Sequence, residues 1–187
     1  SIGGRGPDSL PEVSFSLRDG GRVTLGGKVD RIDLWEHDGK VAVRVVDYKS
    51  GEHKFSLDEV RTGEDLQLVL YLFAACSADP QRRVAGGAEF LFATHSDRRT
   101  EIARSGFLSD DSAICEAADA SSDSRFTKKL LRRSEEELHE LFAEMQSAVC
   151  SVAERILTGE AHKTPSEKAC RFCPVADCCD CAVKAKE

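Results

Sequence analysis

The sequence has no long hydrophobic run and no excess of positive charge. Its longest apolar stretch, Leu68 to Cys76, is far shorter than the roughly 20 residues that a helix needs to cross a bilayer. No segment resembles a secretory signal peptide, so we expect a cytoplasmic protein with no membrane contact. The net charge of -7 argues against a protein that coats nucleic acid by charge alone, but not against one that meets DNA at a local site.

The chain does have enough apolar residues for a core. With 187 residues and 41% hydrophobic content, we expect a single domain over 1–187. Because the sequence opens abruptly and without a starting methionine, we expect it to be a fragment of a longer subunit. Composition and pattern divide it into an irregular lead-in (1–21), a core (22–108), a loop or insertion (109–126), a long helix (127–160) and a Cys-rich tail (161–187).

The order of hydrophobic patterns predicts a mixed α/β fold. Two apolar runs, Arg22 to Trp35 and Lys40 to Lys49, are joined by an Asp-Gly pair, which is a strong hairpin signal. A helical period then runs from Leu57 to Cys76, and Ala85 to Ser96 predicts a further strand. With the long helix that follows, this order predicts a small mixed sheet flanked by helices.

Local sequence signals also support the predicted loop and the predicted long helix. Ser109 to Ser124 is acidic and serine-rich with weak periodicity, so it predicts a loop. The later helix has a capping box in Ser134 and Glu137, and Gly159 lies where that helix should end.

The hairpin carries acidic residues at positions that its register brings together. If the Asp-Gly pair forms a two-residue turn, facing residues have numbers that sum to 77, so Asp30 faces Asp47 and Asp33 faces Arg44. The alternation of strand side chains places Lys49 on the same face as Asp47. Asp33 points to the other face, where we expect an ion pair with Arg44.

Two facing carboxylates destabilise a hairpin unless a proton or a cation lies between them. A magnesium ion is often held by one or two carboxylates, with water and substrate phosphate completing the shell. A nearby lysine such as Lys49 can orient an attacking water and offset charge that develops on a phosphate. The alternative interpretation is a surface hairpin with incidental charges.

Three motifs carry a family resemblance. "GKVDRID", "VVDYKSG" and "LQLVLY" resemble, in order and spacing, the motifs of the RecB-like branch of the PD-(D/E)XK nuclease superfamily. The resemblance spans Val23 to Cys181 and implies a restriction-endonuclease-like core that hydrolyses DNA with Mg²⁺ or Mn²⁺. By position it implies metal ligands at Asp30, Asp47 and the Tyr48 carbonyl, and it places Asp30, Asp47 and Lys49 in the catalytic set. Gln67 and Tyr71 match the helix motif and complete that set, where they could reach the scissile strand or brace the site.

Five of the eight cysteines lie in the last eighteen residues. Thiolates clustered in this way select zinc or an iron-sulfur cluster, and empty thiols are the third alternative. A self-contained zinc site would use Cys170, Cys173, Cys178 and Cys181.

The tail resembles the end of AddB-type subunits of bacterial helicase-nucleases, in which three late cysteines join an earlier one around a 4Fe-4S cluster. That resemblance implies Cys170, Cys173 and Cys179 as cluster ligands, although no cysteine precedes Asp30 here. We therefore expect the cluster to be incomplete or absent in this fragment.

The same resemblance implies a biological setting. It predicts an exodeoxyribonuclease domain that acts on a single strand fed from an unwound duplex, beside an AddA-type subunit, during recombinational repair of double-strand ends. The rival hypothesis is a catalytically inactive domain that binds DNA ends or serves as a scaffold.

Overall fold

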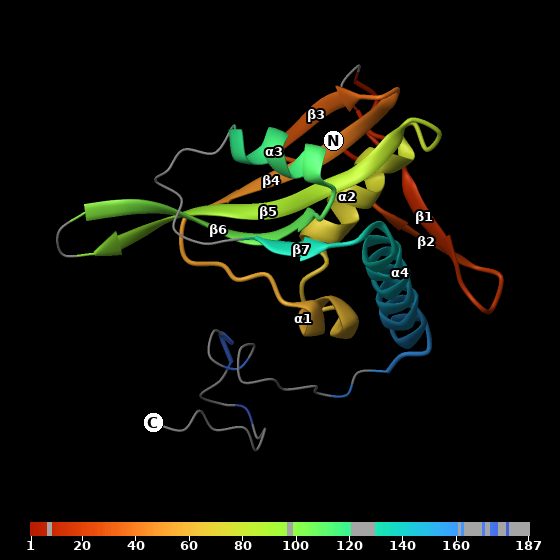
Figure 1. Cartoon of the computed structure of the whole chain (residues 1–187). Coiled ribbons are helices and arrows are strands. Elements are labelled where there is room, and N and C mark those ends of the chain that lie inside the picture. The colour runs from red at the N-terminus through yellow and green to blue at the C-terminus, as the bar shows by residue number, and fades with distance from the viewer. Residues whose placement is uncertain are drawn as a thin grey trace. The chain divides into compact units, whose positions relative to one another are not determined.

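The computed structural model describes residues 1–6, 9–96, 99–120, 130–160, 162, 170, 173–175 and 179. Within these residues, the largest sheet is mixed and five-stranded, which confirms the expected α/β class. Its strands, in spatial order, are β3 (Arg31–His37), β4 (Lys40–Lys49), β5 (Arg83–Ser96), β6 (Arg99–Ser109) and β7 (Leu131–Arg133) (Figure 1). The β4–β5 and β6–β7 pairs are parallel, and the other two are antiparallel.

The predicted hairpin register is confirmed. Arg31 pairs with Val46 and Asp33 pairs with Arg44, as expected for a two-residue turn. Asp38 and Gly39 form that turn with φ angles of 48° and 76°. Positive φ at both residues matches the right-handed twist of the strands, which is why an Asp-Gly pair determines the register here.

Helices cover both faces of the sheet. The helix α2 (Gln67–Ser77) lies behind it, and α3 (Ser112–Ala120) lies in front of it in the view of Figure 1. The side chains of Val43 and Val45 on β4 are fully buried in one apolar cluster with α2 and α4 (Glu135–Leu157). Because Asp47 follows them at the same strand alternation, it faces α2 as well.

The expected strand from Arg22 to Trp35 is wrong as a single element. The chain instead forms β2 (Arg22–Leu25) and then β3, and β2 pairs with β1 (Val13–Ser16) in a separate two-stranded sheet. Residues 1–21, expected to be irregular, thus contain a strand, and Val13 and Phe15 on it are buried. The break falls at a pair of glycines where Ile2 N donates to Gly27 O at 2.8 Å.

Three further expectations need correction. The helical period from Leu57 to Cys76 is interrupted: α1 (Leu57–Thr62) ends at Gly63, whose φ of 80° is the left-handed C-cap geometry, and α2 begins afresh. Residues 112–120, expected to be loop, form α3. The long helix expected over 127–160 begins only at Glu135, because Leu131–Arg133 form β7. By contrast, the capping box of α4 is confirmed, since Ser134 N donates to Glu137 and Glu137 N donates to Ser134 Oγ.

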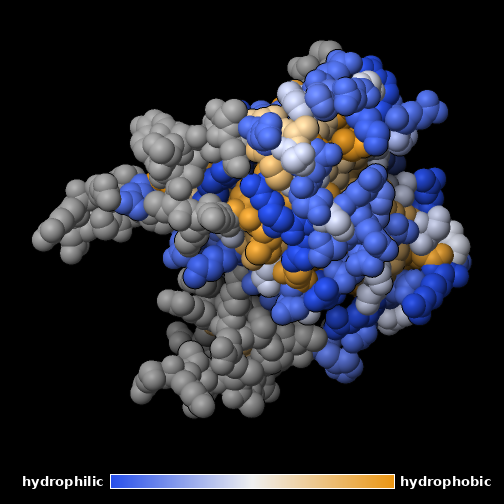
Figure 2. Space-filling model, in the orientation of Figure 1, coloured by the Kyte–Doolittle hydropathy of each residue, from blue (hydrophilic) through white to orange (hydrophobic). Residues whose placement is uncertain are grey.

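Inter-residue contacts divide the chain into two compact units, Ser1–Ala153 and Glu154–Glu187. The first contains the sheet and every residue of the predicted nuclease motifs, while the second contains the end of α4 and the cysteine tail. Among the helices described, none is both long and apolar enough to span a membrane. The face in Figure 2 is largely hydrophilic, with small groups of hydrophobic side chains between charged ones.

Candidate functional site

The predicted site lies where β4 ends against the first turn of α2. Asp47 is 3% exposed, and Lys49, two residues later, is the last residue of the strand. The Lys49 Nζ lies 2.8 Å from Asp47 Oδ2 and 5.0 Å from the centroid of the Phe90 ring. The amine is thus held between a carboxylate and an aromatic face, both of which attract an ammonium group.

Gln67 joins these two residues. Its Nε2 donates to Asp47 Oδ1 at 2.6 Å, and its Oε1 accepts from Lys49 Nζ at 2.6 Å. Because Gln67 is the first residue of α2, the helix positions its amide to orient both strand residues. The sequence alone left Gln67 with two roles, reaching a substrate or bracing the site; the contacts described are of the bracing kind.

Asp30 lies at the open end of the hairpin. The strand pairing stops at Arg31 and Val46, one position before Asp30 and Asp47. There the Tyr48 backbone N–H donates to Asp30 Oδ2 at 3.0 Å. The carboxylate of Asp30 thus takes the place of a backbone acceptor just beyond the last strand pair. This contact brings Asp30, which is exposed, against the residue that follows Asp47.

The oxygen atoms present fit a hard divalent cation. Asp47 Oδ2 is buried, and its contact with Lys49 lacks hydrogen-bond geometry, so this charged acceptor has no hydrogen bond. The Lys49 ammonium 2.8 Å away balances part of its charge, and an oxygen that accepts no hydrogen bond keeps its lone pairs for a bound cation. The described residues hold no group of three or more His, Cys, Asp or Glu side chains suited to a metal. The cation would therefore rest on two carboxylates and a carbonyl, with water or phosphate, as magnesium allows.

Tyr71 is a packing residue. It is 9% exposed, and its ring lies so close to Gly27 that a Cβ there would be 3.0 Å from Cε1 and 3.2 Å from the hydroxyl. Because Gly27 lies in the segment that leads to Asp30, Tyr71 supports the chain just before the site.

The expected Asp33–Arg44 ion pair is wrong, although the two residues face each other. Asp33 Oδ1 accepts from Arg31 Nε at 2.7 Å, and Arg44 bonds to Glu89 instead. Glu89 is 1% exposed and also accepts from Arg104 at 2.5 Å. A fully buried carboxylate attracts both guanidinium groups more strongly than the half-exposed Asp33.

Sequence reasoning missed three residues beside the site. Phe90 pairs with Asp47 across β4 and β5, and no local pattern connects two residues so far apart. His53 and Asp65 form a hydrogen-bond contact of 2.7 Å in the loops that flank α1. For Asp65 a signal existed: it is an N-cap residue type placed two residues before the first residue of a helix.

The cysteine tail is only partly described. Cys170, Cys173 and Cys179 are each half-buried, and Cys173 N donates to Cys170 O at 3.3 Å. Cys178 and Cys181 lie outside the described residues. Because the described part of the tail forms no metal-holding group, the cluster ligands stay a prediction.

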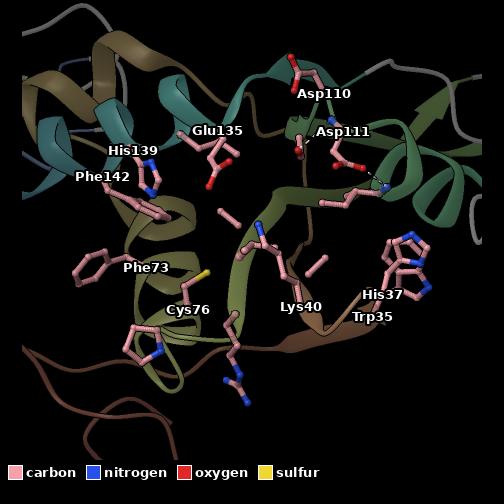
Figure 3. A pocket seen from close by; sticks show the side chains of 18 of the residues that line it. Trp35, His37, Lys40, Phe73, Cys76, Asp110, Asp111, Glu135, His139 and Phe142 are labelled. Atoms are coloured by element: carbon pink, nitrogen blue, oxygen red, sulfur yellow. Dashed lines mark hydrogen bonds between the residues drawn. The ribbon is translucent and has the colours of Figure 1, made fainter.

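A cavity of about 700 Å³ lies at the other end of the sheet (Figure 3). Its lining includes Lys40 and Ala42 at the start of β4, and Phe73 and Cys76 near the end of α2. At about 3.3 Å per strand residue, Lys40 is on the order of 20 Å from Asp47. None of the predicted site residues lines this cavity.

The structure thus has a mixed sheet, a hairpin whose open end carries Asp30 and Asp47, and a helix whose Gln67 bonds to Asp47, which is the arrangement expected of a PD-(D/E)XK nuclease core. The profile of the PD-(D/E)XK nuclease superfamily matches residues 5–180, and the chain belongs to that superfamily.

Curated relatives carry one name. The chain is 33% identical over 206 residues to the B-type subunit of the ATP-dependent helicase/deoxyribonuclease of Symbiobacterium thermophilum, and the match covers 92% of the chain and 18% of the relative. It is 31% identical to the protein of the same name from Clostridium acetobutylicum, over 91% of the chain and 18% of the relative. The chain thus spans about a fifth of the length of these relatives.

Proposed function

We propose that this chain is a DNA nuclease domain that hydrolyses phosphodiester bonds with the help of Mg²⁺ or Mn²⁺. The observation that carries the proposal is the contact set of Asp47, Lys49 and Gln67: a buried carboxylate oxygen without a hydrogen bond, an amine beside it, and an amide that orients both. This set supplies a cation ligand and a positive group at one point, as phosphodiester hydrolysis requires.

Asp30, Asp47 and the Tyr48 carbonyl would hold the cation. When bound, such an ion polarises a phosphate oxygen and lowers the pKa of water. Lys49 is 25% exposed in its side chain, so its ammonium can donate to an attacking water or to a non-bridging phosphate oxygen. Gln67 keeps that ammonium and the Asp47 carboxylate in fixed orientation.

The relatives' names support a proposal for the substrate and the partner. Because those relatives are subunits of an ATP-dependent helicase/deoxyribonuclease, we propose an exonuclease role on a single DNA strand delivered by unwinding. We also propose an AddA-type partner subunit and a role in processing double-strand ends for recombinational repair.

The cysteine tail belongs to the same proposal. Cys170, Cys173 and Cys179 would hold a 4Fe-4S cluster, together with an earlier cysteine of the whole subunit. Anaerobically purified full-length protein should contain about four iron atoms and four sulfides per chain, and Cys173→Ser should remove them. One equivalent of zinc and no iron would overturn this assignment.

The test of the nuclease proposal is Asp47→Ala in the full-length subunit with its partner. We expect loss of magnesium-dependent cleavage of single-stranded DNA at this site, while the affinity for DNA stays close to that of the wild type. Cleavage and binding are measured on the same labelled strand, with a second nuclease site, where the partner has one, inactivated in every sample.

Asp33→Ala is the matched control, because Asp33 lies in the same hairpin but bonds to Arg31 on the other face. It should cleave at the wild-type rate. Undiminished cleavage by Asp47→Ala would contradict the enzymatic proposal and favour the inactive, DNA-end-binding domain.

A further inference from the structure

A histidine and a carboxylate outside the predicted site lie directly against it. His53 follows β4 in the loop to α1, and Asp65 precedes α2 in the turn after α1. His53 Nε2 and Asp65 Oδ2 are 2.7 Å apart, and their side chains are only 31% and 19% exposed. The contact therefore connects two loops whose ends carry Lys49 and Gln67.

The His53 ring packs against an aromatic residue that also contacts the predicted site. It packs edge to face against Phe90, with ring centroids 4.3 Å apart and an interplanar angle of 74°. Phe90 is fully buried and also receives the ammonium of Lys49. Because a buried ring leaves little room for movement, this packing fixes where the imidazole presents its nitrogen atoms.

Asp65 also accepts a hydrogen bond from the main chain of α2. Its second oxygen, Oδ1, accepts from the Gln67 backbone N–H at 3.3 Å. The N-cap residue of this helix, Leu66, makes no side-chain cap, so Asp65 supplies the acceptor in its place. The contacts thus run without a break from His53 through Asp65 to the main chain of Gln67, whose side chain holds Asp47 and Lys49.

We propose that His53 and Asp65 form a positioning pair that holds the first turn of α2 against the loop after Lys49, and so keeps the Gln67 amide between Asp47 and Lys49. The pair acts through Gln67 and does not touch the substrate. Its effect on catalysis rests on the nuclease function proposed above. A neutral imidazole with hydrogen on Nε2 can donate to Asp65 as a charged one does, so the pair does not depend on protonation.

The first test compares variants in the full-length subunit with its partner. His53→Ala should lower kcat on single-stranded DNA about 10-fold, the lower end of what the loss of a supporting contact typically costs. The KM for DNA should stay within about two-fold, since no substrate contact is removed. His53→Gln keeps a donor near the position of Nε2 and should recover most of the rate.

The second test asks whether His53 acts through Gln67. In a Gln67→Ala background, His53→Ala should lower kcat by less than about two-fold further, because residues that act as a unit are not additive. Additive losses would overturn the proposal, and so would an unchanged rate in His53→Ala. A raised KM with intact kcat would also overturn it, because that result marks a direct phosphate contact.

The matched control is His37→Ala. His37 also pairs with an aspartate, Asp38 at 3.4 Å, but it is the last residue of β3, at the opposite end of the hairpin from Asp47, and its side chain is 52% exposed. Its rate should match the wild type.

A third measurement does not depend on nuclease activity. Amide hydrogen exchange over the first turn of α2, residues 66–70, should be faster in His53→Ala than in the wild type and restored in His53→Gln. Unchanged exchange in His53→Ala refutes the positioning pair even if the nuclease proposal holds. Undiminished cleavage in Asp47→Ala refutes the nuclease proposal while leaving this measurement interpretable.

Discussion

Gln67 donates a 2.6 Å hydrogen bond to Asp47, and this bond joins the first residue of α2 to the end of β4. The same amide accepts from Lys49 on its other side. A side chain with one donor and one acceptor group can satisfy a carboxylate and an ammonium at once, which neither a carboxylate nor an amine could do. The bond therefore orients the two charged residues without adding charge to the site.

Gln67→Ala should lower nuclease activity by about 10- to 100-fold, because it frees both Asp47 and Lys49 to rotate away. Steady-state cleavage of a single-stranded DNA, with a magnesium titration, measures the loss. Gln67→Glu should be no better, since it places a second carboxylate beside Asp47 Oδ1 and removes the donor. Gln146→Ala, an exposed glutamine on α4, is the control and should leave the rate unchanged.

Gly27→Ala tests whether the packing of Tyr71 on Gly27 supports the segment that leads to Asp30. The added Cβ would lie 3.0 Å from the Tyr71 ring, so the ring or the segment before Asp30 must move. We expect a loss of about 1–3 kcal/mol in the free energy of unfolding and a reduced cleavage rate. Urea denaturation and a cleavage assay measure the two effects.

Gly26→Ala is the neighbouring control, because the nearest atom to its added Cβ is the Ile2 carbonyl oxygen at 3.8 Å, an ordinary contact. If Gly27→Ala were as stable and active as Gly26→Ala, the tight approach of Tyr71 would have no consequence for the site.

Glu89 is the buried partner of two arginines on the sheet face opposite the site. Glu89→Ala should lower the free energy of unfolding by about 3–5 kcal/mol, because it leaves Arg44 and Arg104 short of their buried counter-charge. Equilibrium urea denaturation checks the value. Glu36→Ala removes an ion pair with Arg82 whose side chains are 66% and 52% exposed, and it should change stability by less than about 1 kcal/mol.

The raised pKa of the Cys76 thiol predicts that the folded protein loses stability at alkaline pH. Burial raises the pKa of its thiol from 9.0 to about 12, and the nearby Arg83 offsets this only in part. Between those values the unfolded chain loses the proton while the folded chain keeps it, so folding weakens as the pH rises above 9.0. One pH unit above that value, the loss should be about 1 kcal/mol.

Urea denaturation at pH 8, 9 and 10 on the wild type and Cys76→Ala tests this, since the variant should lack this part of the pH dependence. The folded thiol should also resist alkylation at pH 8. Alkylation of Cys76 as fast as that of a free cysteine would contradict its raised pKa.

The hairpin was predictable because its determinants are local. An Asp-Gly turn, the alternation of the flanking strands and the numbering of facing residues gave the register that pairs Asp33 with Arg44. The ion pairs did not follow, because Arg44 prefers Glu89 from β5, which is 45 residues away in the chain. No strand was expected over Arg99–Ser109, which contains the charged Arg104, because its burial beside Glu89 depends on tertiary contact.

The amino-acid sequence by itself determined the class of the fold, the helix caps and the spacing of the nuclease motifs, because turns, caps and side-chain periodicity depend on neighbours a few residues apart. Only the tertiary structure decided that Gln67 bridges Asp47 and Lys49, that Tyr71 packs on Gly27, and that His53 and Asp65 border the site. Each of these contacts joins segments that meet only when α2 packs on the sheet, and burial then determines which polar partners remain within reach of one another.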